Sequence, residues 1–590
     1  MKTSVSAALL AACLGVCGLD PGDAAAGEFY VAPDGNDKNP GMPDKPFATV
    51  ARARDAVRRL VAAGLKEDIT VEIRGGIYFL DKPLVFGPED SGTEKHSITY
   101  AAWGEQMPVL SGGRRIIGWK KAQGKLWTVT VPEVKAGKWY FRQLFVDGRR
   151  TVRARTPNKN AEEYCWRLTG AELSQDLKHH TLTLGPGKLK KWKNLNDVEA
   201  VVLKNWATLH KKIEAVEPDT GVVVLQRPHV KYGGGNRPRK GGGCFFENAI
   251  EMLDEPGEWY LDRHNGLLTY WPLEGQDMDK AETIVPVLSH VVEIAGTAEK
   301  LVRNLHFDGI AVMHSHEPLP PEGHHGRQAA FRYGGSSVYG LPSMVRWNWA
   351  NGCSFVGGRI AHAGGSGIAL REGCSRNLIE GNEVFDIAGN GINVGGSNDE
   401  RRVPKENRIA NNYVHRCGEV YYGACAIWAG FAQKTTIEHN LVCDHPYTGI
   451  SIGWCWNPSP TVAREYIVAD NHIYDVMKRV CDGGCIYSLG YQPGTVLRGN
   501  HLHDVHRSRY AIAAPNNGIF LDEGSKGYLI EDNLIHSTSG RPVRHNRNSP
   551  DWHTWKNNTL VEGGLKPEHA DALKQVENAG LEPKWRRLCK

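Results

Sequence analysis

Residues 440–452 read NLVCDHPYTGISI, and residues 471–488 repeat the pattern as NHIYDVMKRVCDGGCIYS. Each copy opens with an asparagine before a short apolar stretch and closes with a second short strand. Strands this short do not pair as hairpins across such long loops, whereas stacked coils pair each strand with its equivalent in the next coil. The pattern therefore predicts a right-handed parallel β-helix in which the asparagines occupy turns and hydrogen-bond along the stack. The asparagine recurs at intervals of 25 to 33 residues, at Asn382, Asn412, Asn440, Asn471, Asn500, Asn533 and Asn558.

The composition fits an ordered β protein that is rich in turns. Hydrophobic residues make up 41% of the 590 positions, which excludes wholesale disorder. The 67 glycines exceed the usual share and follow no collagen period, so we expect them at ordered turns and strand corners. A formal net charge of +5 is too small to indicate a nucleic-acid partner. The 13 cysteines have neither the density of a disulfide scaffold nor paired zinc-ligand spacing.

The character of the sequence changes along the chain, and the changes predict five segments. A capping helix is expected early, because Thr49 can cap a run of apolar residues at helical spacing. Longer alternating strands, among them a hairpin over residues 258–271, indicate an inserted domain that is antiparallel and sandwich-like. The segments are a signal peptide (1–26), an N-terminal cap with the first coils (27–110), the inserted β domain (111–285), the main β-helix (286–562) and a C-terminal cap or tail (563–590).

The first 26 residues have the features of an export signal. Lys2 gives a positive start, residues 7–18 are apolar, and residues 24–26 offer a small-residue cleavage site. We therefore expect a secreted or periplasmic protein with no membrane span, because no later segment is apolar for long enough. The alternative is an outer-surface lipoprotein, since residues 10–13 resemble a lipoprotein cleavage box that would leave a lipid on Cys13.

Catalytic candidates in a solenoid are the residues that break the repeat, because repeated residues are usually structural. Asp482 stands before Gly483 and Gly484, and the pair Asp522 and Glu523 follows the equivalent strand one coil later. Two carboxyl groups about 5–10 Å apart are what glycoside hydrolysis requires. By contrast, four aspartates follow their asparagines at a constant offset and are expected to form turns: Asp386, Asp444, Asp475 and Asp504.

The positions of these acids pose a geometric difficulty. Asp482 lies four residues before Ile486, whereas Asp522 lies three residues after the matching Ile519. Along one straight strand that offset would separate them by about 23 Å, at roughly 3.3 Å per residue. The pair is plausible only if the Gly483–Gly484 turn bends Asp482 back over the groove.

Polar and aromatic residues on neighbouring coils are expected to line the same groove and bind substrate, with Trp428 and Tyr487 as stacking platforms for sugar rings. No metal ligands are assigned, because the histidines within residues 314–325 lie in a proline-rich loop, and no cofactor is expected. The substrate-binding candidates are Glu419, Tyr421, Trp428, His445, Tyr447, Trp454 and Tyr487.

Several motifs resemble glycoside hydrolase family 141 along nearly the whole mature chain. They include Phe29–Ala32, Pro46–Thr49, Trp139–Gly148, Asn205–Trp206, Glu247–Ala249, Glu255–Tyr260, Asp482–Gly484 and Leu521–Gly524. The resemblance implies a secreted β-helix enzyme from a family that includes α-L-fucosidases acting on plant or algal polysaccharides and some xylanases. It also implies two catalytic acids on adjacent coils; here Asp482 precedes Asp522 by 40 positions and Glu523 by 41, so the second acid is ambiguous.

We therefore expect a monomeric, exported glycosidase, an α-L-fucosidase with Asp482 and Asp522 as its carboxyl pair and Glu523 as substitute or auxiliary. A xylanase or β-xylosidase of the same family is one alternative. A polysaccharide lyase is another, with His445 or His503 as base, although the sequence has no dense aspartate cluster for Ca²⁺. A third is a carbohydrate-binding solenoid without catalysis.

Overall fold

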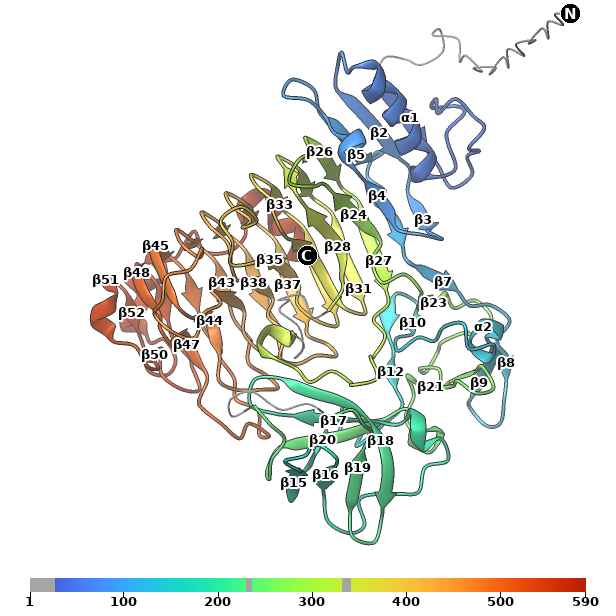
Figure 1. The fold of residues 1–590 in the computed structure, drawn as a ribbon, viewed down its shortest axis with the longest axis vertical. Helices are drawn as coiled ribbons and strands as arrows, with labels where there is room; N and C mark the ends of the chain where they lie inside the picture. The colour runs from blue at the N-terminus through green and yellow to red at the C-terminus, as the bar shows by residue number, and fades with distance from the viewer. Residues whose placement is uncertain (1–26, 230–235, 332–340, 590) are drawn as a thin grey trace, which may run out of the picture.

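The computed structural model describes residues 27–229, 236–331 and 341–589, and Figure 1 shows a long stack of coils beside a separate β-rich insertion. The predicted signal peptide and Cys13 lie outside the described residues. Within these ranges the coils form three parallel sheets, which we number in the order in which the chain visits them. The chain passes from sheet 1 to sheet 2 to sheet 3 in each coil, so equivalent strands stack as the repeat predicted.

The strand bounds follow the short spacing seen in the sequence. Sheet 1 contains β1 (Glu28–Val31), β2 (Ile69–Ile73), β5 (Ile98–Ala102), β26 (Leu305–Asp308), β30 (Ser354–Val356), β33 (Leu378–Glu380), β36 (Arg408–Ala410), β39 (Thr436–Glu438), β42 (Ile467–Ala469), β45 (Tyr491–Arg498), β48 (Lys526–Glu531) and β51 (Thr554–Lys556). Sheet 2 contains β3 (Gly76–Phe79), β6 (Pro108–Ser111), β27 (Ala311–Ser315), β31 (Arg359–Ala363), β34 (Glu383–Ile387), β37 (Tyr413–Cys417), β40 (Leu441–Cys443), β43 (His472–Ile473), β46 (His501–Leu502), β49 (Leu534–Ile535) and β52 (Thr559–Leu560). Sheet 3 contains β4 (Leu84–Phe86), β24 (Val292–Ala295), β28 (Ser343–Asn348), β32 (Ser366–Leu370), β35 (Ile392–Val394), β38 (Ile427–Ala429), β41 (Ile450–Ile452), β44 (Gly484–Ser488), β47 (Asn517–Leu521) and β50 (Val543–His545). A two-stranded pair, β25 (Val302–Arg303) and β29 (Ala350–Asn351), lies outside these sheets.

A short helix closes the N-terminal end of the stack, as predicted (Figure 1). Helix α1 spans Val50–Ala63, and the Thr49 side chain accepts a hydrogen bond from the backbone N–H of Arg52. Its buried face carries Val50, Ala53, Ala56 and Val57, which extend the apolar core of the coils. The helix therefore covers the open end that a stack of coils would otherwise expose.

The inserted domain enters between β6 and β24, at a corner where sheet 2 would pass to sheet 3. Its strands are antiparallel except for one parallel pair, β12 with β21. Two separate apolar cores fill it. Its strands are β7 (Gly113–Arg115), β8 (Lys120–Lys121), β9 (Trp127–Thr130), β10 (Phe145–Val146), β11 (Arg149–Arg150), β12 (Val152–Arg153), β13 (Arg155–Thr156), β14 (Trp166–Arg167), β15 (Gly170–Leu173), β16 (His180–Thr183), β17 (Glu199–Leu203), β18 (Thr208–Glu217), β19 (Val222–Leu225), β20 (Gly243–Glu247), β21 (Glu258–Asp262), β22 (Leu267–Tyr270) and β23 (Thr283–Pro286), with helix α2 at Pro132–Lys135.

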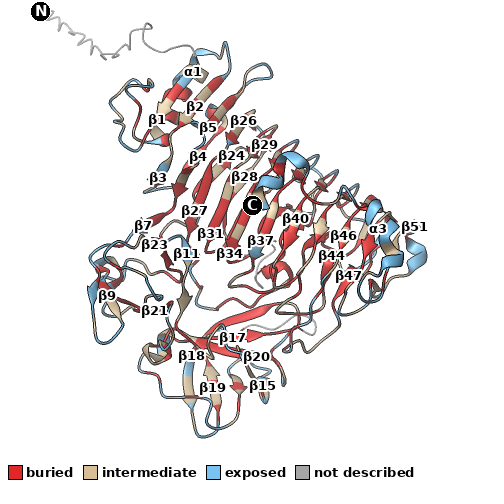
Figure 2. Cartoon of the chain, turned by 180° about the vertical axis from the view of Figure 1, so that it is seen from behind, coloured by how far each residue is buried: buried red, intermediate tan, exposed pale blue. Residues whose placement is uncertain are grey.

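The insertion lies against the coils that carry the candidate acids. Figure 1 places β17 and β20 beside the edge of the stack near β44 and β47, and Figure 2 shows that both insertion strands are largely buried. The backbone N–H of Cys481 donates to the carbonyl of Asn205, at 2.8 Å, which ties the loop after β17 to the residue before Asp482. The insertion therefore forms one wall of the region around Asp482.

The C-terminal segment runs back along the corner between sheets 1 and 2. After helix α3 (Ala570–Gln575), the backbone N–H of Gly580 donates to Asp470, and Glu582 accepts from the Asn411 side chain. The Trp585 ring then occupies the space that a Cβ would need at Gly381. This segment thus covers several coils on the side away from sheet 3.

An asparagine ladder fixes the coil register at the corner between sheets 1 and 2. The Asn440 side chain donates to Asn471 Oδ1 at 3.0 Å and accepts from Asn412 Nδ2 at the same distance. The same contact joins the successive asparagines from Asn382 to Asn558. The predicted hydrogen bonding along the stack is confirmed, and the four aspartates predicted to form turns all have positive φ: Asp386, Asp444, Asp475 and Asp504.

Asn440→Ala is expected to destabilise the protein by at least about 2 kcal/mol, because buried groups of both neighbouring coils lose their partners at about 1–3 kcal/mol each. The matched variant is Asn558→Ala, at the partly exposed end of the ladder, which should cost less. Chemical unfolding of both variants measures the difference. Equal losses would show that the ladder interior contributes no more than its end.

Candidate active site

The two predicted acids stand at opposite ends of neighbouring strands of sheet 3. Ile486 of β44 pairs with Ile519 of β47, which is the match expected from the repeat. Asp482 lies two residues before β44, at the corner from sheet 2, and Asp522 directly follows β47 at the corner to sheet 1. Whether the acids meet therefore depends on the path of the chain around Asp482.

The turn at Asp482 directs its side chain back over the outer face of sheet 3. Asp482 has φ of 67°, and a Cβ at Gly483 would lie 2.5 Å from Thr448 Oγ1, so only glycine fits beside it. Arg544 Nη1 donates to Asp482 Oδ1 at 2.9 Å. Since Arg544 pairs in register with Phe520 of β47, the carboxylate lies over the strands rather than beyond their end.

Asp522 is held by groups on the same face. Asn546 Nδ2 donates to Asp522 Oδ1 at 2.6 Å, and the Tyr487 hydroxyl donates to Oδ2. The partners of the two acids, Arg544 and Asn546, are two residues apart, which is about 6.6 Å along a strand. The negative charge of Asp522 also acts on the Asp482 carboxyl group, so the two acids lie near each other although their positions along the strands are offset.

The environments of the two carboxyl groups differ. Burial raises the pKa of Asp482, the negative charges of Asp522 and Glu523 raise it further, and the Arg544 guanidinium opposes them. The Asp482 side chain is still 20% exposed, so a substrate can reach it. Asp522 has both oxygens engaged as hydrogen-bond acceptors, the arrangement that suits a carboxylate. This contrast is what separate acid and carboxylate roles require.

Glu523 belongs to the same region but points elsewhere. Its Oε1 accepts from Arg547 at 2.8 Å, and the Arg547 side chain is 75% exposed. Its backbone carbonyl accepts from the N–H of Gly490 in the preceding coil. Of the two candidates for the second acid, Asp522 thus has the more constrained side chain.

Comparisons with known proteins find a family match for the inserted domain and another for the β-helix. Residues 124–273 match the family description "GH141 insertion domain", and residues 343–535 match "Right handed beta helix region". A solved structure titled "Glycoside hydrolase" is 28% identical, with a TM-score of 0.81, over 95% of this chain and 100% of that chain. The chain belongs to glycoside hydrolase family 141. The resemblance noted in the sequence and the right-handed helix are both confirmed.

A second solved structure shares the fold of this family 141 protein. Its title is "The complex structure of XylC with xylose", and it is 16% identical with a TM-score of 0.52, over 88% of this chain and 69% of that chain. No curated protein matched the sequence. Membership of family 141 makes the chain a glycoside hydrolase with a carbohydrate substrate. No helix in the described ranges is long and apolar enough to cross a membrane.

Two predicted substrate-binding tyrosines of the family 141 protein instead position the acids. Tyr487 is 1% exposed, and its hydroxyl contacts Asp522. The fully buried Tyr447 donates from its hydroxyl to the backbone carbonyl of Asp482 at 3.1 Å. Burial contradicts the stacking role expected for Tyr487, because a ring with almost no exposed surface cannot stack on a sugar.

The predicted aromatic platform at Trp428 is wrong for a similar reason. Trp428 is fully buried, and its ring packs edge-on against Phe331, which also contacts Trp454. The covering residue comes from the long loop between β27 and β28. Trp454 is 5% exposed and packs on Trp456, which sequence reasoning missed and which is partly exposed. The Asn457 backbone packs against Gly524, which places the partly exposed Trp456 near the corner that carries Asp522 and Glu523.

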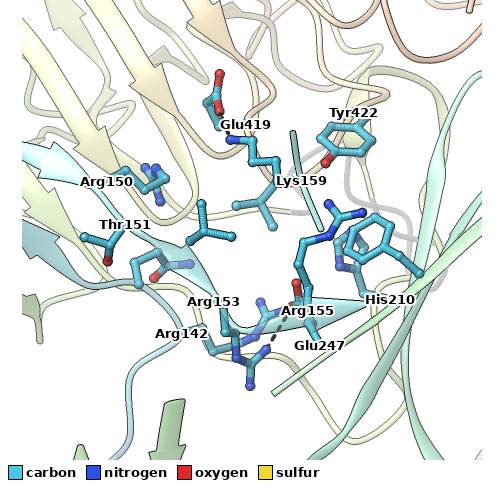
Figure 3. A pocket seen from close by; sticks show the side chains of 14 residues that line it. Arg142, Arg150, Thr151, Arg153, Arg155, Lys159, His210, Glu247, Glu419 and Tyr422 are labelled. Atoms are coloured by element: carbon cyan, nitrogen blue, oxygen red, sulfur yellow. Dashed lines mark hydrogen bonds and ion pairs between the residues drawn. The ribbon is translucent and has the colours of Figure 1, made fainter. Parts of the chain in front are cut away.

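The remaining three predicted contacts lie beside another pocket, between the insertion and the coils. Lys159 Nζ donates to Glu419 Oε2 at 3.0 Å, and Figure 3 shows these two side chains side by side. Tyr421 is buried and donates to Glu317 at 2.5 Å, and His445 is buried with Nε2 on the carbonyl of Ala424. Burial therefore contradicts direct substrate contact by Tyr421 and His445, whereas Glu419 lines this junction pocket. The pocket is lined by Arg142, Gln143, Arg150, Thr151, Val152, Arg153, Arg155, Lys159, His210, Phe245, Glu247, Glu419, Val420 and Tyr422.

In the part of the chain that the structure describes, two cations pair with each of the junction acids Glu199, Glu247 and Glu419, whereas Arg544 alone pairs with Asp482. Arg153 Nη1 lies 2.8 Å from Glu199 and 2.9 Å from Glu247, and Arg142 pairs with Glu199 at 2.6 Å. Charges that are paired this closely are held in place by one another. We therefore interpret the pocket as a docking contact that fixes the insertion on the coils, with the acid pair located on sheet 3.

Proposed function

We propose that this protein is an exported α-L-fucosidase in which Asp482 is the general acid and Asp522 is the partner carboxylate. The observation that carries the proposal is the meeting of two carboxyl groups in unlike environments on the outer face of sheet 3. Asp482 has a raised pKa, and Asp522 accepts hydrogen bonds on both oxygens. This pairing supplies the acid and the nucleophile or base that glycoside hydrolysis needs.

The proposed chemistry assigns one task to each acid. Protonated Asp482 gives its proton to the glycosidic oxygen as the bond to the sugar breaks. Asp522 either attacks the anomeric carbon or removes a proton from the attacking water, and its negative charge stabilises the developing oxocarbenium ion. Tyr487 and Asn546 keep that carboxylate in position.

The choice of fucose rests on the family resemblance, and a substrate panel tests it. Purified protein is incubated with aryl α-L-fucoside, aryl β-D-xyloside and fucose-containing algal or plant polysaccharides, beside an Asp482→Asn control. We expect fucose release that the control lacks. Release of xylose without fucose would change the assigned specificity from fucosidase to xylosidase. If the wild-type protein released no sugar from any substrate of the panel, the assignment of this site as hydrolytic would be wrong.

The alternative classes find less support around sheet 3. His445 is fully buried, and His503 follows β46 in sheet 2, so the bases considered for a lyase do not face Asp482. Lyase products would absorb in the ultraviolet, which the same panel detects. A carbohydrate-binding solenoid without catalysis would bind polysaccharide equally well after Asp482→Asn and release no sugar.

Export is proposed from residues 1–26 alone. N-terminal sequencing of the protein from the native host, together with lipid labelling, tests it. A mature start after Ala26 is expected, whereas a labelled Cys13 would make the protein a lipoprotein.

The activity is expected to fall as pH rises through the pKa of Asp482, because acid catalysis needs its protonated form. Glu523 raises that pKa and Arg544 lowers it. Glu523→Gln should therefore shift the basic limb of the profile of kcat/KM against pH to lower pH, and Arg544→Gln should shift it to higher pH.

Both shifts are measured on a polysaccharide substrate. Asp532→Asn is the matched control, since it removes a charge at the corner between sheets 1 and 2 and should leave the limb in place. Shifts in the same direction for Glu523→Gln and Arg544→Gln would contradict the assignment of the limb to Asp482.

A further inference from the structure

A cluster of histidines covers part of the outer face of sheet 2, away from the acids. His472 of β43 pairs in register with His501 of β46, and their rings stack with centroids 4.7 Å apart. Two residues further along, His503 stacks on His536 of the next coil at 4.8 Å. Four imidazoles from three successive coils therefore meet on one surface.

The ring nitrogens of this cluster converge. The Nε2 atoms of His472 and His503 are 2.8 Å apart, and those of His501 and His536 are 3.0 Å apart. One ligand atom from each of His472, His501 and His503 lies within 4.8 Å of the other two. Zinc binds imidazole nitrogens at about 2.0–2.1 Å, so ligands around one ion lie about 3.3 Å apart. A small movement of the three imidazole side chains toward one another would bring their ligand nitrogens to this spacing.

Hydrogen bonds at the Nδ1 atoms orient two of the imidazole rings for metal coordination. His503 Nδ1 lies 2.8 Å from Asp504 Oδ2 and donates to it, which leaves Nε2 without a proton. His536 Nδ1 lies 2.9 Å from the Ser537 hydroxyl. A carboxylate behind a histidine is the usual support of a metal ligand, because it fixes the tautomer and increases the basicity of the coordinating nitrogen.

Other groups of potential ligands in the described ranges lack these properties. Glu199, His210 and Glu247 lie close together, but Arg142 and Arg153 already neutralise the two carboxylates. His314 of the proline-rich region is buried and shares a hydrogen bond with Ser111. In the sheet 2 cluster, by contrast, no Lys or Arg of the described residues forms an ion pair with Asp504, the carboxylate behind His503.

We propose that His472, His501 and His503 bind one divalent transition-metal cation of the Zn²⁺ class, with His536 beside the open fourth position. Three neutral imidazoles and one open position form a ligand set that Zn²⁺, Co²⁺ and Ni²⁺ accept. The ion would join β43 to β46 across the coil boundary. This site differs from the proposed hydrolytic site, which lies on sheet 3 and uses no metal.

The test uses untagged, full-length protein freed of metal by chelation and titrated with ZnCl₂ by calorimetry. We expect one ion per chain. His501→Ala and His503→Ala should each weaken binding by at least about 100-fold, and Asp504→Asn by about 10–100-fold, as outer partners of metal ligands do. The matched control is His415→Ala, on the same sheet but outside the cluster, which should bind Zn²⁺ normally.

Cobalt gives a second readout that does not depend on activity. Co²⁺ bound through three histidines should give visible absorption bands in the wild type and in His415→Ala, and these bands should be lost in His503→Gln. Circular dichroism verifies that each variant is folded. Absence of Zn²⁺ binding at micromolar concentrations, or binding unchanged in His501→Ala and His503→Ala, would overturn the proposal.

Discussion

Asp522→Asn is expected to reduce kcat/KM by at least about 10³-fold on every substrate, whatever its leaving group. The substitution preserves the shape of the side chain, but it replaces one of the two acceptor oxygens by an amide donor and removes the negative charge. That charge is required in the step at the anomeric carbon, which aryl glycosides and polysaccharides share. Initial rates with an aryl fucoside and with a fucose-containing polysaccharide measure the effect.

Two variants make the Asp522 result specific. Asp532→Asn changes an aspartate ten positions later, at the corner between β48 and β49, and it should retain wild-type rates and folding. Glu523→Gln should stay within about tenfold of wild type at its optimum pH, because Glu523 acts only through the field at Asp482. Wild-type rates for Asp522→Asn combined with loss of activity in Glu523→Gln would move the role to Glu523.

The coil architecture was predictable because equivalent positions of successive coils carry similar residues, so a solenoid is visible as a repeat in the sequence. Each asparagine of the ladder makes the same contact in every coil, so Asn440 and Asn471 occur in equivalent sequence contexts. The register of Ile486 with Ile519 follows from the same repetition. The glycines beside Asp482 could also be interpreted locally, since a turn that tight excludes any Cβ.

Burial on sheet 3 could not be predicted, because the covering segments come from distant parts of the chain. Phe331 covers Trp428 from a loop almost 100 positions earlier, and Tyr421 meets Glu317 in the same way. Periodicity indicates which side chains point out of the coils but not what lies over them. For this reason the predicted aromatic platforms became parts of the interior, while the accessible Trp456 was missed.

The histidine cluster was missed for a different reason. The four histidines come from three coils: about a coil of sequence separates His472 from the neighbours His501 and His503, and another separates these from His536, so they match no compact metal-binding motif. Only the exact stacking of β43, β46 and the strand that follows brings their nitrogens together. The expectation of no metal ligands came from spacing in sequence, which carries no information on register between coils.

Asp482→Asn is expected to have an effect that depends on the leaving group. On a polysaccharide, where a poor alkoxide must be protonated as it leaves, kcat/KM should fall by about 10²–10⁴-fold, the usual contribution of a general acid. An aryl fucoside with an acidic phenol as leaving group needs little protonation, so its kcat/KM should fall far less. The ratio of the two losses is the measurement, with the folded state verified by circular dichroism.

The contrast separates acid catalysis by Asp482 from a structural role. Asp482 also accepts a hydrogen bond from Arg544, and its backbone N–H donates to Asn516 Oδ1 at 3.0 Å, which anchors the turn. Disruption of that turn would misplace both acids and reduce the two rates by the same factor. A larger loss on the polysaccharide than on the aryl fucoside is explained only by a missing proton, because kcat/KM includes the steps up to the first irreversible bond cleavage, where the leaving group departs.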